Sequence, residues 1–410
     1  MNRVLVIGKN WPEPESTAAG VRMMQLLQFF LQHSTQVYFA STAAKNVHSA
    51  DLKSLGIETR VIELNSDLFN QWVKELQPEV VVYDRFMVEE QFSWRVKEVA
   101  PQAFQILNTE DLHSLRDTRR LAFKQEIPFG PDLWRQQTIT HREIGCLLRS
   151  DLNLLVSHFE LQWLKAELPD LAQSSLVLPF MYEELTDNGW RCDFSEREHF
   201  VFIGNGKHEP NKDAVNWLAK DLWPAIHKEL PQAECHIYGS YWPSHTIQSF
   251  QKVKGLSFRG HCSDLNESLQ KYRVNLLPLR YGAGIKGKLA EGMRAGCPSI
   301  STSQGVEGLT EPQGFPGFCG DKAEELIANA IELYQSRVIW EEKQGLISNY
   351  FNANWSATKG HADLDQRLGQ ELHDLDQHRK KRLLQQTLWH HRLRSTEYLS
   401  RYIAEKNKNP

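Results

Sequence analysis

The sequence LLPLRYGAGIKGKLAEGMRAGCPSISTSQGVEGL spans Leu276 to Leu309. It begins in an apolar run, Asn275 to Leu279, which predicts a buried strand. A glycine-rich loop follows, and then a helix-forming segment, Leu289 to Ala295, which Gly296 ends. The run Ser299 to Thr302 predicts a second strand. The whole stretch is therefore expected to form a strand–loop–helix–strand unit.

The loop of this unit has the chemistry of an anion site. Gly282, Gly284 and Gly287 allow the backbone to approach a ligand closely. The helix after the loop presents unpaired N–H groups and a partial positive charge at its N-terminus. Lys286 and Lys288 add two full charges. We therefore predict that a diphosphate binds here, although glycines and lysines of this kind also occur as simple turn formers and surface charges.

Short apolar runs alternate with helix-like segments in both halves of the chain. Val4–Gly8 and Val80–Tyr83 are examples in the first half, and Phe200–Gly204 begins the same pattern again in the second. This alternation is typical of parallel, doubly wound sheets. The fold class that we predict is α/β, with two doubly wound Rossmann-like domains facing a cleft. The expected divisions are an N-terminal domain at 1–185, a C-terminal domain at 186–350 and a charged helical extension at 351–410.

Composition narrows the class of protein. The 410 residues are 41% hydrophobic and 24% charged, with a formal net charge of −4, which gives no reason to expect a nucleic-acid partner. The six cysteines are scattered without a C-x-x-C pair, which fits a reducing compartment. No apolar stretch is long enough for a signal peptide or a membrane span, so we expect a cytoplasmic protein that at most touches the cytoplasmic face of the membrane.

Two further segments of the chain are candidates for function. Asn108–Arg116 follows an expected strand and contains two carboxylates, Glu110 and Asp111, together with His113. This segment is either the capped start of a helix or a set of residues that face a ligand. Residues 362–408 are charged and carry apolar residues at helical spacing, and basic residues predominate from Arg379 onward. They are expected to pack one stripe on the body of the protein or on a second copy, or to lie on a membrane surface.

The stretch from Pro278 to Leu309 closely resembles the GT-B glycosyltransferases, specifically the retaining family 4. The resemblance extends to Phe202–Gly204 and, more weakly, to the segments around Gly20 and Glu110. It covers about residues 1–350. It implies that the second domain binds a UDP- or GDP-linked sugar, with no further cofactor, and that a glycan or polyprenol-linked acceptor approaches from the first domain.

The resemblance also implies roles for individual residues. Glu291 occupies the position of the glutamate that bonds the ribose, Lys286 neutralises the diphosphate, and His113 or Asp111 positions the sugar or the acceptor. The catalytic residues are then His113, Asp111 and Lys286. The donor-binding residues are Gly20, Gly204, Lys207, Lys212, Gly282, Gly284, Ile285, Lys288, Glu291, Ser303 and Gly305. One position departs from the pattern: Ala283 stands where many relatives carry a glutamate near the transferred sugar, which leaves the identity of that sugar open.

The implied chemistry needs no metal. Preorganised amides, a helix N-terminus and lysines can stabilise the negative charge of a departing nucleoside diphosphate. The two D-x-D sequences, Asp363–Asp365 and Asp374–Asp376, lie in the charged C-terminal region and are expected on a solvated helix surface. Two alternatives to a transferase stay open: a non-hydrolysing nucleotide-sugar epimerase, and a GT-B-like subunit that binds without turnover.

Overall fold

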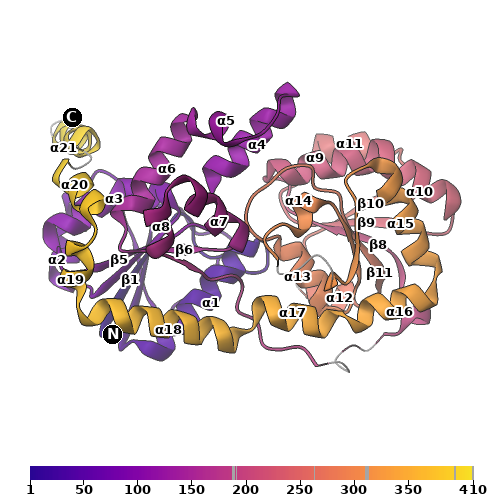
Figure 1. Ribbon diagram of the computed structural model, residues 1–410, viewed down its shortest axis with the longest axis horizontal. Helices are drawn as coiled ribbons and strands as arrows, with labels where there is room; N and C mark the ends of the chain where they lie inside the picture. The colour runs from indigo at the N-terminus through magenta and orange to yellow at the C-terminus, as the bar shows by residue number, and fades with distance from the viewer. Residues whose placement is uncertain (187–189, 191, 263, 310–313, 392–393, 409–410) are drawn as a thin grey trace.

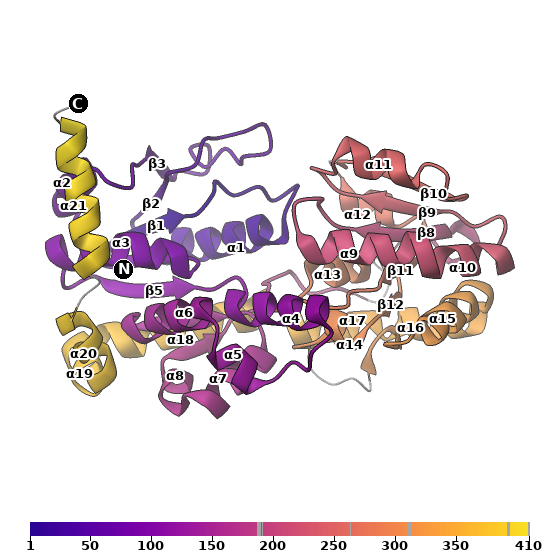
Figure 2. The same cartoon turned by 90° about the horizontal axis from the view of Figure 1, so that it is seen from above.

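The computed structural model describes residues 1–410 apart from 187–189, 191, 263, 310–313, 392–393 and 409–410. The chain forms two lobes, each built around one parallel sheet (Figures 1 and 2). This confirms the predicted α/β architecture of two doubly wound domains.

The first sheet has the strand order β3-β2-β1-β4-β5-β6-β7 and is parallel throughout. Its strands are β1 (Arg3–Gly8), β2 (Gln36–Ser41), β3 (Glu58–Val61), β4 (Val80–Asp84), β5 (Phe104–Asn108), β6 (Leu152–Leu155) and β7 (Ser175–Val177). The helices of this part are α1 (Ala18–His33), α2 (Asp67–Leu76), α3 (Phe86–Val99), α4 (His113–Gln125), α5 (Pro131–Arg135), α6 (Thr138–Arg149), α7 (His158–Glu167) and α8 (Pro169–Gln173).

The second sheet has the order β10-β9-β8-β11-β12-β13 and is also parallel. Its strands are β8 (Glu198–Ile203), β9 (Cys235–Tyr238), β10 (Leu256–Gly260), β11 (Tyr272–Leu277), β12 (Ser299–Ser301) and β13 (Gly317–Cys319). Its helices are a 3₁₀ turn (Phe194–Glu196), α9 (Glu209–Trp217), a π-helical turn (Leu218–Leu222), α10 (Trp223–Glu229), α11 (Ser244–Phe250), α12 (Leu265–Leu269), α13 (Gly287–Arg294), α14 (Ser303–Val306), α15 (Ala323–Gln335) and α16 (Arg337–Gly345).

The C-terminal helices return from the second lobe to the first. They are α17 (Ile347–Trp355), α18 (Ala357–His373), α19 (Leu375–Lys380), α20 (Leu383–His391) and α21 (Arg394–Lys408). In Figure 1, α17 and α18 run along the bottom of both lobes, and α19 to α21, in yellow, lie at the far end of the first lobe. The two chain crossings between the lobes are bonded to each other, since Tyr182 N donates to Trp355 O at 2.8 Å and Ala357 N donates to Tyr182 O at 2.8 Å.

Both faces of the first sheet are buried, which explains its uninterrupted apolar strands. On one face, Leu5 and Val81 pack with residues of α2, α3 and α6. On the other face, Val6 and Val80 pack with α1 and with Leu364 and Leu368 of α18. The apolar stripe of the C-terminal extension therefore packs on the body of the protein and completes a layer of the first domain.

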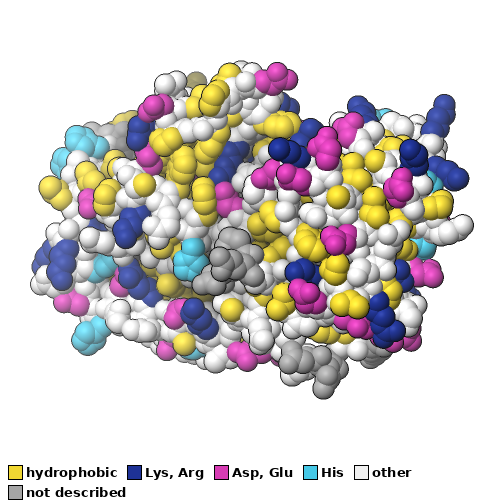
Figure 3. Space-filling view, turned by 45° about the vertical axis from the view of Figure 1, so that its right-hand side comes forward, with side chains coloured by type: hydrophobic (Ala, Val, Ile, Leu, Met, Phe, Trp, Pro, Cys, Tyr) yellow, Lys and Arg dark blue, Asp and Glu magenta, His cyan; other side chains and the backbone are white. Residues whose placement is uncertain are grey.

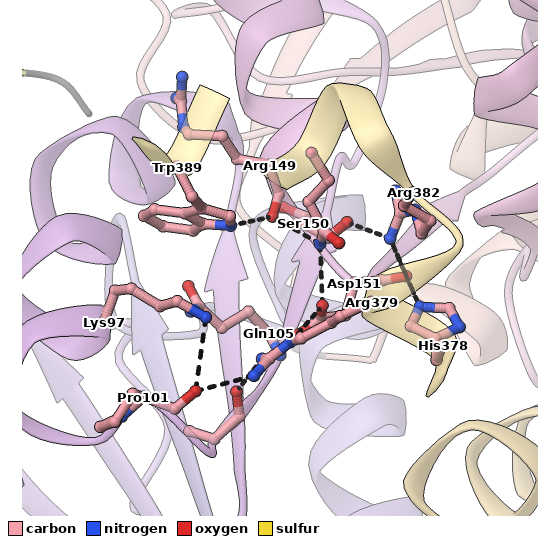
Figure 4. A network of polar contacts seen from close by, with 12 residues as sticks. Lys97, Pro101, Gln105, Arg149, Ser150, Asp151, His378, Arg379, Arg382 and Trp389 are labelled. Carbon is pink, nitrogen blue, oxygen red and sulfur yellow. Dashed lines mark hydrogen bonds and ion pairs between the residues drawn. The ribbon is translucent and has the colours of Figure 1, made fainter. Parts of the chain in front are cut away.

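Two cations of this extension bond to the first domain: Arg379 is buried and Arg382 is half-buried. Arg379 of α19 forms a bidentate ion pair with Asp151, with N···O distances of 3.0 and 2.6 Å, and also donates to Ala103 O (Figure 4). Arg382 donates to Asp151 O at 2.8 Å, and Trp389 Nε1 donates to Arg149 O at 3.0 Å. This network fixes α19 and α20 to the first domain. Contact of the extension with a membrane or with a second copy of the chain stays a prediction.

The surface charge is mixed. On the face drawn in Figure 3, Lys and Arg side chains are interspersed with Asp and Glu, in keeping with the net charge of −4. In the described part of the chain, no helix has the length and apolar character needed to cross a membrane.

Candidate functional site

A cleft of about 860 Å³ separates the two domains. Its walls come from the loops after β1, β4 and β5 on one side and after β8 and β11 on the other. The carboxyl ends of both parallel sheets therefore face the same space, which is where open α/β sheets bind ligands. The glycine-rich loop after β11 and the start of α13 supply much of the second-domain wall of the cleft.

Two lysines supply positive charge on this second-domain wall. Lys286 Nζ donates to two carbonyls of its own loop, Ala283 O at 3.3 Å and Gly284 O at 2.6 Å, and burial lowers the pKa of this lysine. Lys288 Nζ donates to Asn211 Oδ1. Burial, together with the nearby Lys286, lowers the pKa of Lys288 to about 7. Neither ammonium pairs with a carboxylate in the described part of the chain, so both are available to pair with an anion.

Glu291 lies on α13 behind the same loop and lines the cleft. Its carboxylate is held from two sides: Tyr182 OH donates to Oε1 at 3.0 Å, and Arg294 Nη1 lies 3.1 Å from Oε2. These contacts fix the direction of the carboxylate and still leave it at the wall of the cleft. An ionised carboxylate with remaining acceptor capacity suits a vicinal diol.

The opposite wall contains the segment that begins at Glu110. Glu110 has a positive φ of 63° and pairs with Arg22, with an N···O distance of 3.3 Å. Asp111 pairs with Arg116, and His113 Nδ1 lies 3.2 Å from Asp111 Oδ1. Glu110 and Asp111 therefore each already have a cationic partner.

The pKa shifts on this wall follow from burial and pairing. Burial alone would raise the pKa of Asp111, but Arg116 and His113 hold it below its usual value. Burial lowers the pKa of His113 to about 4, against the opposing effect of Asp111. His113 is consequently a neutral imidazole at physiological pH, able to donate or accept a hydrogen bond without carrying charge.

Two acids from distant parts of the chain hold His113 in place. Glu143 accepts hydrogen bonds from His113 N and Ser114 N, both at 2.9 Å, and Glu160 accepts one from Leu112 N at 2.8 Å. They replace the side-chain cap that Leu112 does not supply at the start of α4. Burial raises the pKa of Glu143 to about 7 and that of Glu160 to about 8.

The structure brings most of the predicted site residues together around the cleft. Those that line it are His113, Asp111, Lys286, Gly204, Lys207, Gly282, Ile285, Lys288 and Glu291. Their roles as catalytic or donor-binding residues stay predictions.

Five predicted residues do not line the cleft. Gly20 is buried in α1, where an added Cβ would lie 2.4 Å from the backbone of Glu13. Gly284 has a φ of 64°, and its own Cβ position lies 2.9 Å from Asp111 Cβ, so this glycine permits contact between the domains.

The other three are held away from the cleft by local contacts. Lys212 pairs with Glu209 at 2.7 Å, and Ser303 Oγ donates to Asp321 Oδ1 at 2.9 Å. Gly305 packs on Ser301, whose Oγ leaves no room for a Cβ.

Several cleft residues were not singled out from the sequence. They are Lys9, Arg85, Arg120, Tyr182, His208 and Arg294. Lys9 and Arg85 follow directly on β1 and β4, so their position after a strand was the available signal. Tyr182 had no such signal because it lies in the connection between domains.

Two Rossmann-like domains that face each other across a cleft define the GT-B fold, the second domain of which binds a nucleotide-sugar in the glycosyltransferases of this class. Residues 197–336 match the family described as "Glycosyl transferases group 1". The matched range contains Lys286, Lys288 and Glu291. No curated protein matches the chain.

Solved structures share the fold at low sequence identity. HepE of Anabaena in complex with UDP and glucose has a TM-score of 0.64 and 11% identity, over 90% of this chain and 99% of that chain. Sucrose-phosphate synthase of Thermosynechococcus elongatus has a TM-score of 0.65 and 13% identity, over 90% and 99%. WaaG, a glycosyltransferase involved in lipopolysaccharide biosynthesis, has a TM-score of 0.59 and 12% identity, over 86% and 97%. The family match and the fold together support a GT-B glycosyltransferase.

Proposed function

We propose that the protein transfers a hexosyl residue from a UDP- or GDP-linked donor to a glycan or polyprenol-linked acceptor, with retention of configuration, as a cytoplasmic member of family 4. The observation that carries this proposal is the second-domain wall of the cleft. There, two lysines without carboxylate partners lie beside a fixed carboxylate, Glu291, within the range that matches the glycosyl transferases. The bound UDP and glucose of HepE support a UDP-sugar as the first donor to test.

The roles of the residues follow from charge. Lys286, Lys288 and the N-terminus of α13 would stabilise the leaving diphosphate, and Glu291 would accept hydrogen bonds from the ribose. Neutral His113 would position a hydroxyl of the sugar or of the acceptor. Glu110 and Asp111 are each paired with an arginine, so neither is a free nucleophile. This arrangement supports a same-face reaction in which the leaving phosphate takes the proton of the acceptor, and it asks for no metal.

The test is incubation of the purified protein with UDP-, GDP- and dTDP-sugars, followed by NMR of the products. We expect slow hydrolysis of one donor to a sugar with the same anomeric configuration. Release of an epimerised donor would instead show an epimerase, and binding of no nucleotide-sugar would overturn the proposal.

A pair of variants separates the site from general charge effects. Lys286→Ala should reduce hydrolysis at least tenfold. Lys212→Ala removes the same charge from a lysine outside the cleft, paired with Glu209, and should leave hydrolysis unchanged. Equal losses of hydrolysis in both variants would show that the loop carrying Lys286 takes no specific part in the reaction.

A further inference from the structure

Two cations on the first-domain wall of the cleft share one acid. Lys9 and Arg85, from the loops after β1 and β4, share a single carboxylate, that of Asp84. Asp84 Oδ2 accepts a hydrogen bond from Lys9 N at 3.2 Å and lies 3.8 Å from Arg85 Nη1. In the part of the chain that the structure describes, the guanidinium of Arg85 makes no hydrogen bond and the Lys9 ammonium has no ion pair. The group of Lys9, Arg85 and Asp84 thus carries one net positive charge.

The backbone at Arg85 is strained. Its φ of 75° and ψ of 155° lie in a region that glycine alone adopts readily. Arg85 N donates to Asn108 O at 2.7 Å, which holds the chain in this conformation between β4 and α3. Glycine would relieve the strain but would remove the guanidinium. An arginine at such a position indicates that its side chain, not its backbone, is what the site requires.

The two cations also act on each other. Partial burial and the Arg85 guanidinium lower the pKa of the Lys9 ammonium. An oxyanion bound between them would remove this repulsion and supply the acceptor atoms that Arg85 lacks. The pair lies near the reacting region, because the ring of Phe86, the residue after Arg85, packs edge-on against His113 with 5.5 Å between centroids.

We propose that Lys9 and Arg85 bind an oxyanion, a phosphate or carboxylate, that is part of the acceptor. The cations stand on the first-domain wall, opposite the lysines assigned to the donor diphosphate, so the two anions would occupy separate subsites. The acceptor is therefore an anionic molecule, such as a sugar phosphate or a lipid-linked phosphate. The inference that the oxyanion belongs to an acceptor rests on the proposed function, whereas the existence of the oxyanion site does not.

The test measures oxyanion binding with the donor subsite filled. Calorimetric titrations of the wild-type protein, alone and saturated with UDP, would use inorganic phosphate, glucose 6-phosphate, glucuronate and a short-chain polyprenyl phosphate in detergent. We expect at least one of the three organic probes to bind saturably in the presence of UDP. Tight binding of glucose 6-phosphate or glucuronate identifies a soluble acceptor, and tight binding of the polyprenyl phosphate alone identifies a lipid-linked one. Binding of inorganic phosphate alone would mean an adventitious ion only and would overturn the proposal.

Variants connect the binding to the two cations. Arg85→Gln and Lys9→Gln should each weaken the organic probe at least tenfold and leave UDP affinity within twofold. Arg135→Gln removes a cation outside the cleft, where it pairs with Glu167, and should leave the probe affinity unchanged. Equal losses of probe affinity in all three variants would show that Lys9 and Arg85 do not form an oxyanion site.

Arg85→Gly keeps the experiment decisive if Arg85→Gln folds poorly. Because glycine accepts the strained backbone, this variant should melt no lower than the wild type and still lose the probe. Undiminished probe binding in a folded Arg85→Gly protein would refute the proposal. Failure of UDP to bind, with Arg85-dependent oxyanion binding intact, would instead refute the proposed transferase function and leave the oxyanion site standing.

Discussion

The position of Glu291 leads to the most specific prediction about the donor. Its contacts with Tyr182 and Arg294 hold the carboxylate at the cleft wall, where in the proposed function it accepts hydrogen bonds from both ribose hydroxyls. Glu291→Ala should weaken UDP binding at least tenfold, about 1.4 kcal/mol. Calorimetry with UDP and with 2′-deoxy-UDP checks the assignment.

The deoxy analogue serves as the control. Wild-type protein should prefer UDP over 2′-deoxy-UDP, and the Glu291→Ala variant should bind the two nucleotides equally. Retention of the wild-type preference in the variant would place the ribose elsewhere.

We expect Lys288 to make the affinity for the donor depend on pH. Its pKa is about 7 in the free protein because of burial and Lys286, and a bound diphosphate raises it. Proton uptake on binding then means that affinity falls as pH rises above about 7, by up to about tenfold per unit. Titrations of a UDP-sugar between about pH 6 and 8.5 measure this, since the diphosphate diester itself does not titrate there.

Lys288→Arg provides the comparison for this pH effect, because a guanidinium stays charged throughout the range. The variant should bind the UDP-sugar with an affinity nearly independent of pH. An equally steep pH dependence in Lys288→Arg would show that another group takes up the proton.

The sequence predicted those site residues that depend on local structure. Lys286, Lys288 and Glu291 lie on one loop and the helix after it, so their spacing alone brings them to one wall. Glu143 and Glu160 reach the start of α4 from 30 and 48 residues further along the chain, and no local pattern contains that information. They were found only from the folded chain.

At the scale of elements, the C-terminal helices depend on one buried ion pair. The Asp151 carboxylate is almost fully buried and is satisfied by Arg379, Gln385 and the amide of Gln105. Although burial would raise the pKa of Asp151, these partners lower it below its usual value. Their stabilising contribution is therefore present at neutral pH and is lost only as pH falls below the usual range of an aspartate.

Removal of one partner should consequently destabilise the protein strongly. Arg379→Ala leaves the buried Asp151 carboxylate without its cation, which costs about 3–5 kcal/mol. Urea denaturation at neutral pH measures the change. Lys380→Ala, at the exposed neighbouring position, removes the same charge and should change stability by less than about 0.5 kcal/mol. Similar midpoints for the two variants would mean that the network does not hold α19.

Elements were predictable where their own residues decide their burial. The apolar runs of β1 and β4 are buried on both faces and predicted a covered parallel sheet. The stripe of Leu364 and Leu368 likewise predicted a packed helix. Arg379 looked like part of an exposed cationic surface because its partner, Asp151, lies 228 residues earlier in the chain. Pairing at such a distance leaves no periodic signal.

At the scale of the whole molecule, the two domains are connected at a hinge and at a latch. The hinge is the paired crossing of Tyr182 and Ala357, and Tyr182 also donates to Glu291 of the proposed donor site. The latch lies across the cleft: Arg119 of α4 makes a bidentate ion pair with Glu307, with both N···O distances 2.7 Å, and donates to Gly282 O at 2.8 Å. A ligand that touches the glycine loop and Glu291 therefore touches both connections.

Arg119→Ala should open the donor-free protein. The ion pair is mostly buried, at 8% and 12% side-chain exposure, and its loss removes the strongest polar contact across this edge of the cleft. We expect the closed state to lose on the order of 1–2 kcal/mol, a five- to thirtyfold shift toward open forms. Small-angle X-ray scattering should show a larger radius of gyration. Saturating UDP-sugar should reduce it again, since in the proposed function the second-domain wall binds the diphosphate and His113 of the first domain positions the sugar. Arg135→Ala breaks an exposed pair with Glu167 inside the first domain and should leave the scattering unchanged. A variant at Arg119 with the wild-type radius of gyration would show that packing at the hinge, and not the latch, holds the domains together.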